Sequence, residues 1–153
     1  MAGETDFTPD EWLTVRRAIT AAGVIVALAE GGGDDMLSEI FAVTQTIRGA
    51  GFGHGNRLVR ELAAMPHFST GLRPGMRSPE YEAESLPMIR AAAAIVRSRA
   101  PDDLNEWRGF VCELAETAAR AHKEGGVAGI GGILVTAAEA AAIERVRQAA
   151  GLA

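Results

Sequence analysis

The stretch AEGGGDDMLSE, residues 29–39, ends one long apolar segment at three glycines and begins another at two aspartates. The stretch KEGGVAGIGGILVTAAE, residues 123–139, repeats this arrangement near the end of the sequence. The long segment before each stretch opens on a similar triplet, DEW at 10–12 and NEW at 105–107. A unit that occurs twice predicts a duplicated architecture, here a helix, a glycine turn and a second helix.

The composition favours an all-α fold in a single domain. The chain has 153 residues, of which 48% are hydrophobic and only 5% are aromatic. An alanine-rich sequence with few aromatic residues favours closely packed helices, because strands are enriched in β-branched and aromatic residues. A chain of this length suits one domain with a sizeable core. We therefore expect one helical domain over 1–153, with repeat-like halves at 7–49 and 104–152 and an insertion at 50–103.

Local signals predict a bundle of six or seven helices. Thr8 and Glu11 form a capping box, with Pro9 at the first helical position. Thr136 and Glu139 form a second capping box near the C-terminal end. The expected helices cover 9–29, 34–48, 57–65, 78–99, 103–124 and 137–150.

Several features are expected to interrupt these helices. The glycine-rich range 49–55 predicts a flexible connector, and the range 66–77, with two prolines and two glycines, predicts an irregular loop. Pro87 is expected to kink the helix over 78–99 or to divide it into two. The range 130–135 is the only β-like run, and a short extended piece is predicted there.

Charge and hydropathy narrow the class of protein. The net charge is −5 and no basic stripe is present to neutralise phosphates, so nucleic acid is not an expected partner. Residues 1–6 lack the apolar region of a signal peptide, and the apolar stretch 18–29 is too short to span a bilayer. We therefore expect a cytoplasmic protein without an integral membrane segment. The single cysteine, Cys112, lies in an apolar helical pattern and is expected to be buried.

The first glycine turn carries the candidate metal ligands. Asp34 and Asp35 follow the glycines, and Glu39 lies one helical turn further on. Carboxylate oxygens gathered in this way are suitable ligands for a divalent cation such as Ca²⁺ or Mg²⁺, the one cofactor that the sequence suggests. The alternative interpretation is structural: the two aspartates cap the following helix, and Glu39 interacts favourably with its N-terminal dipole.

The middle of the chain carries a second set of candidate residues. His54 lies among glycines, His67 follows a proline, and Arg73 lies in the predicted loop. These side chains are the candidate ligand-binding residues if a pocket between the helices is gated by the range 49–77, since long irregular loops often serve as lids. The alternative interpretation is that they are solvated surface residues.

The paired units resemble the TerB-like family of tellurite-resistance proteins. The resemblance rests on the glycines and aspartates of 31–35 with Glu39, and on the glycines of 125–126 with the range 136–139. It covers 7–49 and 104–152, and it implies a compact, internally duplicated helical fold that binds metal through acidic turn residues. The chain is also similar to uncharacterised bacterial proteins that end in an EGG-x-x-GIGG stretch.

These patterns favour a binding or scaffold module over an enzyme. The first hypothesis is a non-catalytic TerB-like module with a divalent cation at Asp34, Asp35 and Glu39. The second is an enzyme or small-ligand-binding protein with a pocket between its helices. A third is association with other proteins, or with a second copy of the chain through the alanine-rich range 91–94.

Overall fold

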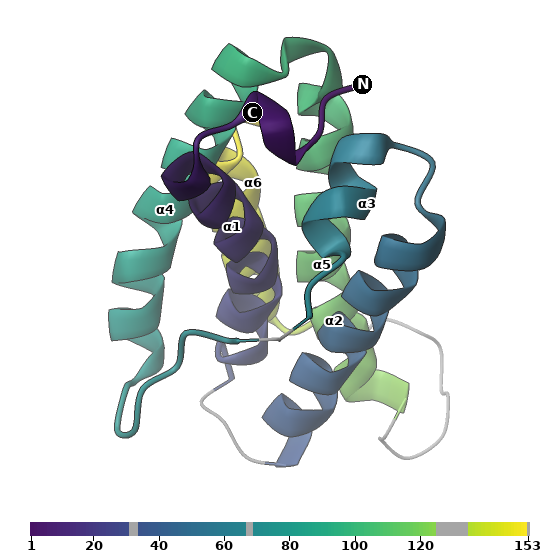
Figure 1. Cartoon of the computed structure of the whole chain (residues 1–153). Coiled ribbons are helices and arrows are strands. Elements are labelled where there is room, and N and C mark those ends of the chain that lie inside the picture. Colours follow the sequence, from purple (N-terminus) through teal and green to yellow (C-terminus); the bar gives the residue numbers. More distant parts are fainter. Residues whose placement is uncertain (31–33, 67–68, 125–134, 153) are drawn as a thin grey trace.

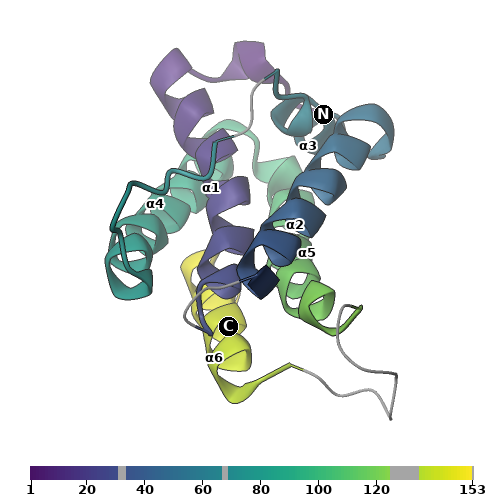
Figure 2. The same ribbon diagram turned by 90° about the horizontal axis from the view of Figure 1, so that it is seen from below.

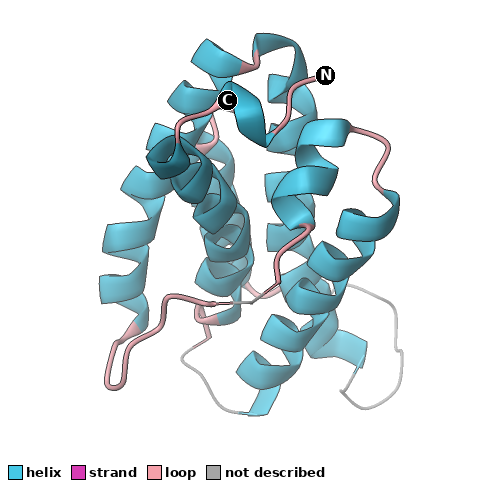
Figure 3. Ribbon diagram, in the orientation of Figure 1, coloured by secondary structure: helices cyan, strands magenta, loops and turns pink. Residues whose placement is uncertain are grey.

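The computed structural model describes residues 1–30, 34–66, 69–124 and 135–152. Within these ranges the chain is helical and contains no strand, which confirms the predicted all-α class (Figure 3). Two short 3₁₀ helices accompany the α-helices. The elements in chain order are η1 (Glu4–Asp6), α1 (Pro9–Ala27), α2 (Asp34–Gly53), α3 (Arg57–Ala63), α4 (Ser78–Arg99), η2 (Pro101–Asp103), α5 (Leu104–Glu124) and α6 (Ala137–Ala149).

Helices α1 and α6 begin where predicted, because both starts carry a capping box. Thr8 Oγ1 accepts a hydrogen bond from Glu11 N at 3.2 Å, and Glu11 Oε2 accepts one from Thr8 N at 2.8 Å. Thr136 and Glu139 make the same reciprocal pair at 3.1 and 3.0 Å. Each box satisfies two backbone N–H groups, one of them an orphan donor of the first helical turn.

Helix α1 lies at the centre of the fold. Every residue from Ala18 to Leu28 is buried, and α1 contacts each of the other five α-helices of the described chain. Figure 1 shows α4 on one side of α1 and the pair α2 and α3 on the other, and Figure 2 shows the same arrangement from below. A helix that is apolar on all sides has to be enclosed by other elements, which explains this arrangement.

The middle segment, expected as an insertion between two halves, contributes to the same core. Leu58 and Leu62 of α3 are fully buried, as are Ile89 and Val96 of α4. Helix α4 lies against α1 and α6, and α3 lies against α2 and α5. One hydrophobic core therefore joins the predicted halves and the segment between them.

One local prediction is wrong, and one of the two effects predicted for Pro87 does not occur. The glycine-rich range 49–55 is not a connector throughout, because α2 continues to Gly53. Pro87 does not divide the helix that contains it, because α4 runs unbroken from Ser78 to Arg99. Of the extended piece predicted at 130–135, only Val135 is described, and it is not in a strand.

Packing against α3 favours a glycine at position 51 of α2. A Cβ atom added to Gly51 would lie 3.1 Å from the carbonyl oxygen of Ala63, at the end of α3. The backbones of α2 and α3 therefore approach more closely than a larger residue would allow. This contact outweighs the poor helix propensity of glycine, which is about 1 kcal/mol less favourable than alanine.

The predicted burial of Cys112 is confirmed. Cys112 of α5 is 6% exposed, and burial raises the pKa of its thiol. No helix in the described ranges has both the length and the apolar character needed to cross a membrane.

A second close approach joins α1 to α2. A Cβ atom added to Gly23 of α1 would lie 2.6 Å from both Cγ atoms of Val43 in α2. Both residues are buried, so neither side chain has open space to move into. The distance between these two helices therefore depends on the missing side chain at position 23.

We expect Gly23→Ala to destabilise the protein by about 1–3 kcal/mol, because overpacking a tight core forces side chains and backbone to shift. Gly49→Ala is the matched control, since a Cβ atom there meets nothing within 4 Å. We expect this exposed substitution within α2 to stabilise the protein by about 0.5–1 kcal/mol. Urea unfolding of the two variants measures both effects, and equal behaviour of the two would contradict the proposed contact.

Candidate functional site

Two buried glutamates, Glu39 of α2 and Glu139 of α6, form an unusual polar feature of the core. Glu39 is 2% exposed and Glu139 is 0% exposed. The two carboxylates lie near enough for the charge of Glu139 to raise the pKa of Glu39. Acidic side chains are seldom fully buried, because taking a carboxylate out of water costs free energy, so this pair marks a candidate functional site.

Thr136 connects the glutamate pair to the end of α1. Its hydroxyl donates a hydrogen bond to Glu30, which follows α1, and its backbone N–H donates to Glu139 Oε2 at 3.0 Å. The other oxygen of that carboxylate, Glu139 Oε1, is buried and has no hydrogen-bond partner among the described residues. A buried acceptor without a partner costs about 1–3 kcal/mol, so this oxygen would gain from a cation or a donor.

Burial and negative neighbours raise the pKa of Glu39 from its ordinary value of 4.5 to about 7. Burial is the largest cause, because desolvation disfavours the charged form of a carboxyl group. The negative charges of Glu139, Asp35 and Glu30 add to the shift in that order. Glu39 therefore titrates near neutral pH, and a cation at this place would favour its ionised form.

The predicted cation ligands are placed at the start of α2. Glu39 lies in the buried pair, and the exposed Asp35 is near enough to act on its charge. Asp34 is the first residue of α2, and its side chain lies outside the described part of the structure. Within the described residues, no three His, Cys, Asp or Glu side chains are placed to hold one metal ion together.

Glu30 and Glu139 belong to the site, although the first glycine turn alone does not identify them as ligands. The local sequence predicts that Glu139 caps a helix, and in the structure it does form part of the capping box of α6. The available signal is the repeat, because Glu139 takes the place of Glu39 in the second unit. The sequence does not predict the contact of Glu30 with the site, because its hydrogen bond with Thr136 depends on the packing of α1 against α6.

The contacts of the candidate residue His54 hold the local fold together. Its Nδ1 atom accepts a hydrogen bond from Asn56 N at 3.0 Å, and its carbonyl oxygen accepts one from Arg60 at 2.7 Å. Its ring lies 5.7 Å from the ring of Phe110, centroid to centroid. These contacts hold the turn between α2 and α3. The candidate residue His67 lies outside the described residues.

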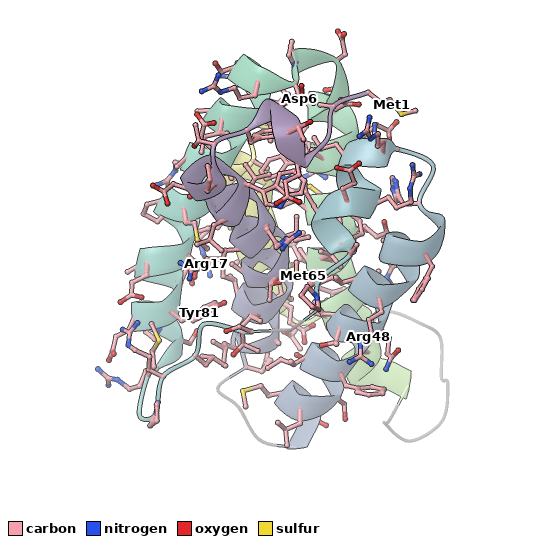
Figure 4. The ribbon with its side chains drawn as sticks, viewed as in Figure 1. Met1, Asp6, Arg17, Arg48, Met65 and Tyr81 are labelled. Carbon is pink, nitrogen blue, oxygen red and sulfur yellow. The ribbon has the colours of Figure 1, made fainter. Side chains whose placement is uncertain are left out.

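A cavity of about 500 Å³ lies between α1, α4 and the loop after α3. Arg73, the third candidate ligand residue, lines this cavity, and His54 does not. Figure 4 labels three further lining residues, Arg17 of α1, Met65 of the loop and Tyr81 of α4, on the side of the molecule where this loop runs. The cavity is distinct from the glutamate pair, because neither Glu39 nor Glu139 lines it.

No family model, no curated protein and no solved structure matches this chain. The resemblance to TerB-like proteins therefore stays a prediction from the sequence. The glutamate pair and the cavity are the two features from which a function can be argued.

The pKa of Glu39 makes the stability of the protein depend on pH. The unfolded carboxyl ionises near 4.5 and the folded one near 7, so the folded state binds more protons between these values. The stability that protonated Glu39 contributes is therefore fully present below the lower pKa. This contribution is lost as the pH rises through the higher pKa. At about 1.4 kcal/mol per unit, the loss amounts to about 3 kcal/mol.

We expect Glu39→Gln to remove this loss, because glutamine fills the same space without ionising. The variant should gain stability relative to the wild type between about pH 5 and about pH 8. Urea unfolding at the two pH values, without divalent cations, measures the difference. Glu113→Gln, an exposed change in the middle of α5, should follow the wild type; a parallel pH dependence in all three proteins would contradict the raised pKa.

Proposed function

We propose that this chain is a non-catalytic helical binding module, TerB-like in kind, that holds a divalent cation between Glu39 and Glu139. The observation that carries the proposal is the burial of two neighbouring carboxylates, one of which has an oxygen without a hydrogen-bond partner among the described residues. Two buried like charges repel each other, and a cation between them replaces this repulsion with attraction.

The surroundings of the pair suit a hard cation with oxygen ligands. Asp35 and Glu30 add negative charge close to Glu39, although neither is buried. Mg²⁺ typically binds through one or two carboxylates and keeps several waters, so it does not need three protein ligands. Two glutamates therefore supply as many carboxylates as Mg²⁺ ordinarily takes from a protein.

The position of the pair favours binding over catalysis. Glu39 and Glu139 belong to different helices, and Thr136 connects Glu139 to the end of α1. A cation held there would join α2 and α6 and would stabilise the contact of both with α1. The cavity, where an organic substrate would fit, lies elsewhere. The expected role of the site is thus to make the fold more stable when a cation is bound.

We expect Mg²⁺ or Ca²⁺ to raise the melting temperature at about pH 8, where Glu39 is mostly ionised. A ligand that binds only the native state stabilises it by about 2.7 kcal/mol at 100 times its Kd. Differential scanning fluorimetry with each cation, and with Zn²⁺ for comparison, measures this shift.

Variants make the cation test specific. Glu39→Gln and Glu139→Gln should each lose most of the cation-dependent shift, whereas Glu113→Gln should keep it. Glutamine at position 139 can still accept the hydrogen bond from Thr136 N, so the helix cap is preserved. The absence of a shift in the wild type at millimolar cation, or an equal shift in all variants, would exclude the proposed site.

A further inference from the structure

The cavity between α1, α4 and the loop after α3 has the size of a small-molecule site. Its volume of about 500 Å³ falls within the range of about 300–1,000 Å³ that is typical of ligand pockets. The loop is fixed to α4 on one side of the cavity. Tyr81 Oη donates a hydrogen bond to the carbonyl oxygen of Thr70, and Arg73 pairs with Glu84 through two bonds of 2.8 and 3.0 Å.

The cavity wall carries an excess of positive charge. Its lining includes Arg16, Arg17 and Arg73 but only one carboxylate, Glu84. Arg73 already neutralises Glu84, so the charges of Arg16 and Arg17 remain uncompensated. This charge is local, because the whole chain has a net charge of −5.

The two arginines of α1 are available for a ligand. Arg17 is exposed and makes no hydrogen bond or ion pair with any other described residue. Arg16 has its guanidinium group 5.4 Å from the centre of the Trp12 ring, and its one hydrogen bond, to the carbonyl oxygen of Glu61, is long at 3.4 Å. Neither guanidinium is paired with a carboxylate of the described chain, and a planar guanidinium can bind a carboxylate through two parallel bonds.

The rest of the lining provides apolar contact. Leu13 and Ala21 line the cavity from α1, Met88 lines it from α4, and Met65 lines it from the loop. Leu13 is 43% exposed, so part of its apolar surface is accessible to a ligand. Methionine side chains adapt to irregular shapes, so this wall suits a flexible apolar group.

We infer that this cavity binds a small organic monoanion with an apolar tail, such as a short-chain carboxylate. The carboxylate lies against Arg17 and Arg16, and the tail lies against Leu13, Met65 and Met88. This site is independent of the proposed cation site, since the two share no residue. Failure of one leaves the other unaffected.

Isothermal titration calorimetry with octanoate and octan-1-ol tests the inference, because the two probes share a tail and differ in charge. We expect octanoate to bind at least about tenfold more tightly than octan-1-ol, since each factor of ten corresponds to about 1.4 kcal/mol and charged hydrogen bonds contribute at least that much. Equal affinity for the two probes, or no binding of octanoate at millimolar concentration, would overturn the inference.

Substitutions at Arg17 test whether the carboxylate of octanoate binds at this residue. Arg17→Gln should weaken octanoate binding about tenfold and leave octan-1-ol binding unchanged. Arg17→Lys should fall between the wild type and Arg17→Gln, because lysine keeps the charge without the planar fork. Arg48→Gln is the matched control, since Arg48 is an exposed arginine of α2 that does not line the cavity (Figure 4).

A variant of the apolar wall completes the design. Leu13→Asp, at a partly exposed position, should abolish octanoate binding while the protein remains folded by circular dichroism. Octanoate affinity that is unchanged in Arg17→Gln and Leu13→Asp, or reduced equally in Arg48→Gln, would place the probe outside this cavity and refute the inference.

Discussion

The complete burial of the second half of α1 is the constraint on which the rest of the structure depends. From Ala18 to Leu28 this helix has no polar face for solvent, so the other helices have to enclose it. Small residues allow them to come close, as the contact between Gly23 and Val43 shows. The arrangement of α2, α4, α5 and α6 follows from the need to cover this one helix.

Both candidate sites are located relative to the same helix. The cavity lies along its first half, where Leu13, Arg16 and Arg17 reach a less closely covered side. The glutamate pair is connected to its far end through Glu30 and Thr136. A change in how α1 is enclosed would therefore affect either site, even though the two share no side chain.

Local signals were sufficient for the parts of the fold that depend on short segments. The starts of α1 and α6 are fixed by capping boxes within four residues, so the sequence alone predicts them. The helical state of Gly51 depends on the close approach of Ala63, which no local rule contains. Because this contact is not visible in the sequence, the glycines of the range 49–55 predict a connector where α2 continues.

The candidate site shows the same division between local and distant contacts. The carboxylates of the first glycine turn are visible in the sequence, and Glu39 is indeed near other acidic groups. Its neighbour Glu139 is 100 positions away, and only the packing of α6 against the end of α1 brings them together. The raised pKa of Glu39 is a property of that packing, so it could not be read from residues 29–39.

The single thiol of Cys112 can report the opening of α5 without an engineered cysteine. Thiolates, not thiols, react with alkylating reagents, and this sulfur is both enclosed and harder to ionise than a free one. Its rate of alkylation is therefore governed by how often α5 separates from its neighbours. A maleimide would record the opening of a single helix in an otherwise unmodified chain, because no other cysteine competes for the reagent.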